Sequence, residues 1–541
     1  MRNRPDNHLF YGDNLIVLRR QIDDASIDLV YLDPPFNSNA NYNILFRSPT
    51  GSSADAQIEA FEDTWHWNDT AEDAFDQVAR SGNTKAFDLL NAMRSFLGEN
   101  DMMAYLSMMA VRLMELHRVL KPTGSLYLHC DPTASHYLKL LLDGIFGPAQ
   151  FQNEIIWKRT SAHSSAKRYG PVHDTILFYA KSVDFVWNRT FTKYDPAYVE
   201  TFFDQIDADG RRWKRMDLTG AGIRNGDTGK VWRGIDVTAK GRHWAYPPSR
   251  LDELDAAGRL HWPAKETGMP RLKQYPEDLP GVPLQDIFCD VRPMHNLAEE
   301  RLGYPTQKPL ALLERIIASS SRKGDVVLDP FCGCGTAIHA AQKLGRQWIG
   351  IDVTHLAISL IEKRMHAAFP GIGFTVEGTP KDLASAQDLA ARDKYQFQWW
   401  AVSMVDAMPF GGRKKGADGG IDGLIYFKPD GRRTEKALVS VKGGDHVGVQ
   451  MIRDLHSAME REKAPIGIFL TKALPTSVME REAAAVGRFQ SEATGKSYPR
   501  LQIITIAELF RGRKPDIPYV DPTAGMKRAG REEMGKQGRL L

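Results

Sequence analysis

The sequence has few cysteines and no long apolar run, and both absences narrow the class of protein. Its 541 residues contain Cys130, Cys289, Cys332 and Cys334, which are too few for a disulfide framework. No stretch of about 18 apolar residues predicts a membrane-spanning helix, and residues 1–6 lack the apolar core of a signal peptide. We therefore expect a protein of the reducing cytoplasm with no membrane contact.

The sequence also lacks the signature of a nucleotide-driven motor. Thr494-Gly495-Lys496-Ser497 resembles the end of a P-loop, but Gln490 occupies the position where that motif needs its first glycine. We therefore expect no ATP-driven motor in this chain.

The net charge is small, only +3, so it does not identify a partner. Basic and aromatic residues nevertheless interleave between positions 187 and 262, among them Trp187, Arg211, Trp213, Arg233 and Trp262. DNA phosphates attract cations, and base contacts use arginine and stacking aromatic rings. Alternatively, the tryptophans form a local core and the cations a solvated face. Composition leaves both interpretations open.

The length predicts two or three domains. Apolar strands expected at 27–32, 125–129, 325–328 and 347–351 alternate with helical segments at 86–120, 134–145 and 336–344, which indicates an α/β sheet. Between 161 and 296 the pattern breaks into short pieces, which predicts an irregular module outside the sheet. A polar helical segment, 381–393, suits a linker, and a second α/β pattern follows it.

Asp33-Pro34-Pro35-Phe36 directly follows the expected strand 27–32. A carboxylate and a rigid backbone carbonyl can both accept hydrogen bonds from an exocyclic amine, and an aromatic ring can stack on the base that bears it. The plainer interpretation is a strand that ends in a proline-rich turn. These residues alone allow either.

A second strand runs into a glycine loop, Asp329-Pro330-Phe331-Cys332-Gly333-Cys334-Gly335-Thr336. The glycines let the backbone approach a ligand, and Asp352, after the next strand, can accept both hydroxyls of a ribose. A nicotinamide dinucleotide fits poorly, because Ile338 replaces the third glycine of its fingerprint and Asp329 would repel a pyrophosphate. A nucleoside with a cationic amino-acid moiety, such as S-adenosylmethionine, fits better. Zinc is disfavoured because no second cysteine pair lies nearby.

These segments, with Tyr304-Pro305-Thr306-Gln307-Lys308-Pro309 just upstream of the glycine loop, resemble the amino-methylating DNA methyltransferases in the permuted arrangement called the β class. The catalytic motif comes first and the cofactor motifs last, as in that class; one departure is Cys334, where the family usually carries serine. The resemblance implies a Rossmann-like α/β methyltransferase domain formed by 1–160 and 297–378, with a target recognition region at 161–296. It further implies that S-adenosylmethionine is bound by Thr306, Lys308, Asp329, Pro330, Phe331, Gly333, Gly335, Thr336 and Asp352.

The resemblance also implies a mechanism on double-stranded DNA. The target base is flipped out of the duplex, because its amine is unreachable in the stack. Asp33 and the Pro34 carbonyl would accept hydrogen bonds from that amine and Phe36 would stack on the base, with Pro35 also part of this catalytic motif. In this family an aspartate in the first motif position usually accompanies adenine N6, and serine accompanies cytosine N4. Adenine is therefore favoured, with cytosine as the alternative.

The C-terminal part carries a second candidate site. A hairpin expected over 424–442 can bring Asp422 close to Lys442, a pair that suits Mg²⁺-dependent phosphodiester hydrolysis with Asp422 as metal ligand. Residues 395–515 resemble the Mrr-like branch of the PD-(D/E)xK restriction endonucleases, which implies a smaller α/β domain after a linker at 379–394. Ser440 stands where that family expects an acid or glutamine. This replacement should weaken metal binding unless Gln450 or Asp418 compensates. Residues 516–541 are expected to form a disordered basic tail.

Three hypotheses follow from these motifs. The first is a DNA adenine methyltransferase joined to a nuclease-like domain, in restriction–modification or a related defence role. The second is a solitary methyltransferase whose C-terminal domain only binds DNA, and the third is a non-catalytic DNA-binding protein. Intact Asp33, Gly333, Gly335, Thr336 and Asp352 argue against the third. The sequence is also compatible with a homodimer.

Overall fold

The structure is a computed structural model that describes residues 7–35, 66–161, 167, 169–264, 268–294, 300, 307–410, 420–430, 433–491 and 495–518, together with the backbone of 41–45 and 57–62. Two compact units are present, one formed by Arg189–Gln285 and the other by the remaining described residues. Within the described ranges, no helix combines the length and apolar character that crossing a bilayer requires.

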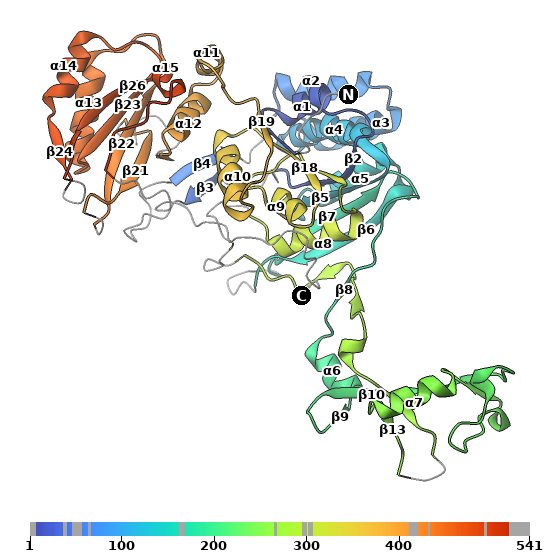
Figure 1. The fold of residues 1–541 in the computed structure, drawn as a ribbon. Helices are drawn as coiled ribbons and strands as arrows, with labels where there is room; N and C mark the ends of the chain where they lie inside the picture. Colours follow the sequence, from blue (N-terminus) through green and yellow to red (C-terminus); the bar gives the residue numbers. More distant parts are fainter. Residues whose placement is uncertain are drawn as a thin grey trace. The chain divides into compact units, whose positions relative to one another are not determined.

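A nine-stranded sheet forms the centre of the larger unit (Figure 1). Its order is β16-β6-β7-β5-β2-β17-β18-β1-β19. The strands are β1 (His8–Tyr11), β2 (Ile27–Leu32), β5 (Leu120–Cys130), β6 (Phe151–Lys158), β7 (His173–Ala180), β16 (Ile287–Phe288), β17 (Val326–Asp329), β18 (Gln347–Asp352) and β19 (Thr375–Glu377). The α/β sheet and its four expected strands are confirmed.

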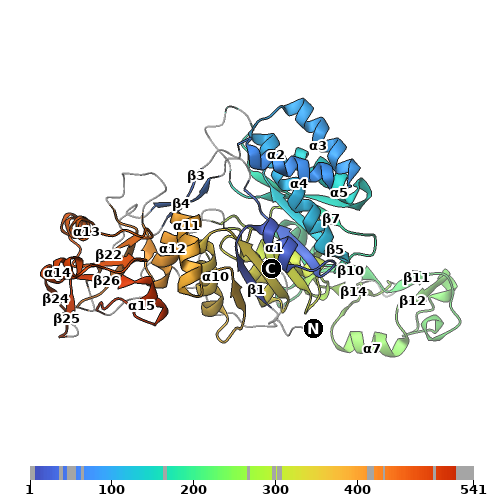
Figure 2. The same ribbon diagram turned by 90° about the horizontal axis from the view of Figure 1, so that it is seen from above.

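Helices cover both faces of this sheet. Both faces of β2 are apolar and need cover. Val30 and Leu32 point into one hydrophobic cluster, and Leu29 and Tyr31 point into the other. The first cluster includes α1 (Asn14–Gln21), α2 (Asp69–Arg80), α3 (Thr84–Leu97), α4 (Asp101–Val119) and α5 (Ser135–Phe146), of which α2, α3 and α4 lie together in Figure 2. The second includes α8 (Leu310–Ser320), α9 (Thr336–Lys343) and α10 (His355–Ala368).

The expected single helix over 86–120 is two helices. Gly98 ends α3 with a positive φ of 73°, a conformation that glycine adopts readily, and its N–H bonds the Arg94 carbonyl. Asn100 then caps α4 by accepting a hydrogen bond from the Met103 N–H. The helical periodicity of the sequence continues across this break, so it did not reveal the turn.

The prediction that 161–296 lies wholly outside the sheet is wrong at both ends. The strand β7 pairs antiparallel with both β5 and β6, and β16 pairs parallel with β6. The reason is burial, because seven of the eight β7 residues are buried and must lie within the sheet. The separate unit is therefore shorter than the expected recognition region and spans Arg189–Gln285.

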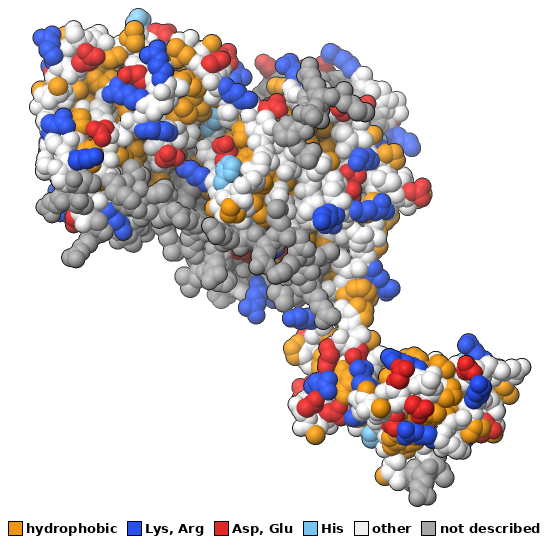
Figure 3. Space-filling view, in the orientation of Figure 1, with side chains coloured by type: hydrophobic (Ala, Val, Ile, Leu, Met, Phe, Trp, Pro, Cys, Tyr) orange, Lys and Arg blue, Asp and Glu red, His pale blue; other side chains and the backbone are white. Residues whose placement is uncertain are grey.

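This smaller unit has its own four-stranded sheet, of order β13-β14-β10-β9. It contains β8 (Phe191–Thr192), α6 (Pro196–Phe202), β9 (Gln205–Ile206), β10 (Arg212–Asp217), β11 (Thr219–Ala221), β12 (Arg242–Trp244), α7 (Pro248–Ala256), β13 (Leu260–His261), β14 (Arg271–Gln274) and β15 (Val282–Pro283). Trp213, Trp232 and Trp244 are buried, so these tryptophans form core, whereas Trp187 and Trp262 are half-exposed. Figure 3 shows cations and acids interleaved on its visible face.

The C-terminal residues form a five-stranded sheet of order β20-β21-β22-β23-β26. The expected hairpin is confirmed, since β21 and β22 pair antiparallel. The elements are α11 (Leu383–Arg392), α12 (Lys394–Met404), β20 (Met408–Pro409), β21 (Gly423–Phe427), β22 (Glu435–Lys442), α13 (Val449–Arg461), β23 (Ile466–Thr471), α14 (Ser477–Ala485), β24 (Arg488–Gln490), β25 (Ser497–Pro499), β26 (Leu501–Thr505) and α15 (Ile506–Phe510).

The expected linker 379–394 is also corrected. Ala386, Leu389 and Ala390 of α11 are buried in the same cluster as Phe397 and Val439, so this helix belongs to the C-terminal core. The polar face of α11 had suggested a free linker, but its apolar face is covered. The predicted disordered tail, 516–541, lies outside the described residues from 519 onward.

Candidate active sites

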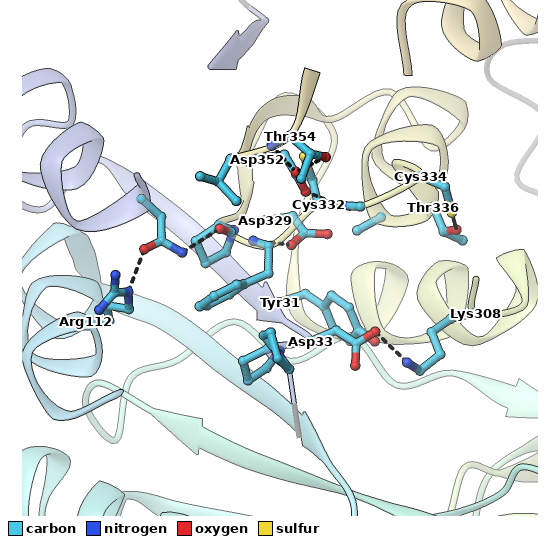
Figure 4. A pocket seen from close by; sticks show the side chains of 18 of the residues that line it. Tyr31, Asp33, Arg112, Lys308, Asp329, Cys332, Cys334, Thr336, Asp352 and Thr354 are labelled. Atoms are coloured by element: carbon cyan, nitrogen blue, oxygen red, sulfur yellow. Dashed lines mark hydrogen bonds and ion pairs between the residues drawn. The ribbon is translucent and has the colours of Figure 1, made fainter. Parts of the chain in front are cut away.

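Three neighbouring strands of the nine-stranded sheet end at one pocket. The strands β2, β17 and β18 are parallel neighbours, so their carboxyl ends share one edge of the sheet. Asp33, Asp329 and Asp352 stand at these ends and line a common cavity of about 370 Å³ (Figure 4). The structure thus brings Asp33, from near the start of the chain, together with two carboxylates from its second half.

The residues after β2 form one wall of this pocket. Asp33, Pro34 and Pro35 all line it. One carboxylate oxygen of Asp33, Oδ2, accepts a hydrogen bond from the Lys308 ammonium. The other oxygen, Oδ1, is buried and has no hydrogen-bond partner among the described residues. A buried acceptor without a donor is costly, so this atom suits a donor supplied by a ligand.

The glycine loop forms the facing wall. The Asp329 carboxylate accepts from the Phe331 N–H at 3.1 Å, and that of Asp352 accepts from the Gly333 N–H at 2.9 Å. Gly335 has a positive φ of 74° and begins α9. The predicted cofactor residues that line the pocket are Lys308, Asp329, Pro330, Phe331, Gly333, Thr336 and Asp352. Gly335 does not line the pocket, and the predicted residues Thr306 and Phe36 lie outside the described residues.

Burial changes the acidity of the two facing carboxyls. It raises the pKa of Asp329 well above its usual range, and the nearby charges of Asp33 and Asp352 add to this effect. Burial also raises the pKa of Asp352 to about 6, although Thr354 and Gly333 donate hydrogen bonds to it. A ligand with a cationic group near Asp329 and hydroxyls near Asp352 would stabilise both ionised forms. S-adenosylmethionine has these groups, so the residues fit it.

A polar network that also lines the pocket, next to the glycine loop, was not predicted from the sequence. Buried Arg112 of α4 donates to the Asn14 side chain at 2.7 Å and to Asp13 at 2.8 Å. Asn14 in turn donates to the Pro330 carbonyl at 2.9 Å. These hydrogen bonds tie the start of α1 to the glycine loop, and the only hint in the sequence is an arginine within an otherwise apolar helix face.

The second candidate site lies in the C-terminal sheet. Asp422 is buried just before β21, and its carboxylate is 4.0 Å from the Lys442 ammonium at the end of β22. The structure therefore brings these two predicted residues together. The same carboxylate accepts from the Val441 N–H at 2.5 Å and from the Ser440 hydroxyl at 3.4 Å. Gln398 of α12 donates to its other oxygen.

The described residues offer a Mg²⁺ ion too few ligands at this site. Asp422 is one carboxylate that also accepts hydrogen bonds from protein donors, and the described ranges contain no group of three or more His, Cys, Asp or Glu side chains placed to hold a metal. Gln450, one residue expected to compensate for Ser440, instead donates to Asp454. Asp418, the other, lies outside the described residues.

Gln398 was missed at the sequence level. The sequence does contain a sign of its role, because Gln398 is a polar residue among Phe397, Trp399 and Trp400 of α12. All three of these neighbours are buried. A glutamine in such a run needs a partner, but only the folded chain identifies Asp422 as that partner.

Comparison with known proteins matches the two parts of the chain that contain these sites. Residues 27–363 match the family model of DNA methylases, and 389–505 match that of a restriction endonuclease domain. The type II methyltransferase M.EcaI of Enterobacter cloacae is 32% identical over 360 residues, which cover 66% of this chain and 69% of that protein.

Two further relatives are more distant. The Mod subunit of the type III restriction-modification enzyme StyLTI of Salmonella typhimurium is 27% identical over 64% of this chain and 51% of its own length. The DNA adenine methyltransferase YhdJ of Escherichia coli is 26% identical over 66% of this chain and 83% of its own length. Because the DNA methylase model spans more than half of the chain, the protein belongs to the N6/N4 DNA methylase family and carries a restriction endonuclease-like domain.

Proposed function

We propose that this chain transfers a methyl group from S-adenosylmethionine to N6 of an adenine flipped out of double-stranded DNA. The observation that carries the proposal is the buried Oδ1 of Asp33 at the pocket, which has no hydrogen-bond partner among the residues that the structure describes. An exocyclic amine supplies the missing donor. With Lys308 holding the other oxygen, the Asp33 side chain is fixed in one orientation for that amine.

Each wall of the pocket has a separate task. Asp33 and the Pro34 carbonyl accept the amine hydrogens and aim the nitrogen lone pair into the pocket, while Phe36 stacks on the base. Asp329, Asp352, the glycine loop, Thr306 and Thr336 hold the cofactor. When bound, S-adenosylmethionine supplies a methyl group on a positively charged sulfur. Positioning and electrostatics then provide most of the catalysis.

Adenine is favoured over cytosine by two observations. Asp33 stands in the first motif position, where the resemblance associates aspartate with adenine. One relative, YhdJ, is itself named a DNA adenine methyltransferase. Cytosine N4 is the second candidate, because its amine offers the same two hydrogens.

Methyl transfer to unmethylated DNA tests the proposal. Asp33→Asn keeps the size of the side chain but puts an N–H₂ donor in place of one acceptor, so we expect the transfer rate to fall about 100-fold or more. Asp73→Asn, on the exposed face of α2, is a matched control and should leave the rate unchanged. Base-resolved mapping of the product should show N6-methyladenine. Equal rates in Asp33→Asn and wild type would contradict the assignment.

The smaller unit, Arg189–Gln285, supports a role in target recognition within the predicted region 161–296. Arg224 and Lys240 are exposed on it, while several other cations pair with neighbouring acids, as Arg233 does with Asp255. The exposed cations can contact phosphates, and the exposed face of Trp262 can contact bases.

For the restriction endonuclease-like domain we propose DNA binding, with Lys442 as a phosphate contact. The fully engaged Asp422 carboxylate supports binding without cutting. DNA cleavage is the second candidate, favoured by the closeness of Asp422 to Lys442. A role in restriction–modification, a homodimer and a cytoplasmic location are further proposals that rest on the sequence.

A further inference from the structure

Three buried polar side chains connect the interior of the large sheet to the methylation pocket. They are Tyr31 on β2, His129 on β5 and Asp174 on β7, which are adjacent strands in the order β7-β5-β2. Their exposed fractions are 2%, 0% and 1%. Apolar residues occupy most neighbouring positions of these strands, so this polar set is an exception in the core.

Hydrogen bonds join the three side chains in series. The Tyr31 hydroxyl lies 2.9 Å from Nδ1 of His129, and Nε2 of His129 lies 3.0 Å from Oδ2 of Asp174. Because a carboxylate only accepts, Nε2 carries a hydrogen that it donates to Asp174. In the neutral imidazole, Nδ1 is then the acceptor, and the Tyr31 O–H donates to it. This is the hydroxyl–imidazole–carboxylate order of a hydrolase triad.

Stability does not explain this arrangement. Burying an ionised aspartate and a histidine costs several kcal/mol, and apolar residues of similar size often stabilise a core equally well or better. The carboxylate is nevertheless kept ionised. Burial acts to raise the pKa of Asp174, but the hydrogen bond and charge of His129, together with Lys308 and Arg159, hold that pKa below its usual range. A maintained buried carboxylate next to an imidazole indicates proton chemistry.

The Tyr31 end of the series opens into the pocket. Tyr31 lines the same cavity as Asp33 and Lys308, and Figure 4 shows Tyr31 beside Asp33. Burial first, and then the charge of Asp33, raise the pKa of Tyr31 well above its ordinary value. The tyrosine therefore stays protonated and can pass a proton along only by receiving another at the same time.

We propose that Tyr31, His129 and Asp174 form a relay that takes up the proton released by amine methylation; this rests on the proposed function. Methyl transfer leaves the amine nitrogen with one proton too many, and that proton moves to the Asp33 carboxylate. Asp33 then gives it to the Tyr31 oxygen while the Tyr31 hydroxyl proton moves to Nδ1 of His129. The resulting imidazolium is stabilised by Asp174, and Asp33 is ionised again.

The relay requires a neutral His129 at the start, because Nδ1 must accept the proton that leaves Tyr31. The ionisable groups around His129 are Tyr31 from β2, Asp174 from β7 and Arg159 after β6, with Asp33 and Lys308 at the pocket.

Tyr31→Phe in the full chain tests the relay, because it removes one hydroxyl and keeps the ring. We expect the single-turnover methylation rate at saturating S-adenosylmethionine to fall about 10- to 100-fold, with the Kd for S-adenosylmethionine unchanged. Tyr127→Phe is the matched control. Tyr127 lies on β5, is equally buried and bonds Ser320 at 2.6 Å, away from the pocket, so it should behave as wild type.

Asp174→Asn provides a second readout, because it weakens the stabilisation of the imidazolium. We expect the single-turnover rate to fall while the Kd for S-adenosylmethionine is unchanged. A Tyr31→Phe enzyme with the wild-type rate would overturn the relay, as would an equal loss in Tyr127→Phe or a loss that saturating S-adenosylmethionine restores. Methylation by the wild-type protein, measured alongside these variants, tests the proposed function separately. If the wild-type protein did not methylate DNA, both the proposed function and the relay would be overturned.

Discussion

Asp33, Asp329 and Asp352 are the same residue type at the same sheet edge, yet their surroundings give them different properties. Asp33 has one oxygen held by Lys308 and one without a partner in the described part of the chain, which suits an amine donor. Asp329 is fully buried, so burial raises its pKa well above the usual range until a cation approaches. Asp352 receives hydrogen bonds from Thr354 and Gly333 and keeps a pKa of about 6. The different surroundings of the three aspartates therefore suit them to different ligand groups: an amine, a cation and ribose hydroxyls.

The pKa of Asp352 predicts how cofactor binding depends on pH. Only the ionised carboxylate can accept from both ribose hydroxyls, and ionisation increases as pH rises through about 6. From pH 7 to pH 5 the ionised fraction falls about 10-fold, so the Kd for S-adenosylmethionine should rise by about the same factor. Calorimetric or fluorescence titration of the full chain at both pH values measures this change.

Asp352→Asn is the control for that assignment. The amide does not titrate, so the Kd should be weaker at pH 7 and should change less between pH 5 and pH 7. A Kd that is flat with pH in the wild-type protein would show that Asp352 does not contact the cofactor through its ionised form.

At the scale of elements, the turn from β17 into α9 shows how a short loop depends on glycine. Gly335 has a φ of 74°, and a Cβ there would lie 2.8 Å from Cγ1 of Ile361 on α10. Gly324 has a similar φ of 88°, but a Cβ there would meet nothing within 4 Å. Substitutions at the two glycines can therefore be compared to distinguish the cost of backbone strain from the cost of steric crowding.

We expect Gly335→Ala to destabilise the fold more than Gly324→Ala. Both substitutions carry the left-handed backbone cost of about 1 kcal/mol, whereas Gly335→Ala adds the displacement of Ile361. Thermal unfolding should therefore give a lower Tm for Gly335→Ala, and its affinity for S-adenosylmethionine should also fall. Equal Tm values in the two variants would show that Ile361 moves aside without cost.

Local patterns were sufficient to predict most elements, and long-range pairings were not. The apolar strand 27–32 and the glycine loop carry their signals in adjacent residues, and both appear as expected. The contact of His129 with Asp174, and that of Gln398 with Asp422, join residues from separate strands and helices. Such contacts depend on strand order and helix packing, which periodicity does not specify. The sheet position of β7 was missed for the same reason.

At the scale of the whole molecule, one chain combines a methylase domain with a restriction endonuclease-like domain. The two sites differ in how complete they are. In the methylation pocket, Oδ1 of Asp33 has no partner among the described residues and can accept from a substrate, whereas the Asp422 carboxylate has donors on both oxygens. We therefore expect the methylase to be active and the second domain to bind DNA without cutting it.

Incubation of the full chain with Mg²⁺ and either unmethylated or methylated plasmid tests this expectation. We expect no cutting of either substrate, and weaker DNA retention in Lys442→Ala, because a phosphate contact is lost. Lys436→Ala is the matched control, since Lys436 lies at the opposite end of β22 and pairs with Glu462 at 3.0 Å. Cutting that disappears in Lys442→Ala but persists in Lys436→Ala would instead establish a nuclease. If that cutting were also blocked by prior methylation through Asp33, the two sites would form a restriction–modification pair within one chain.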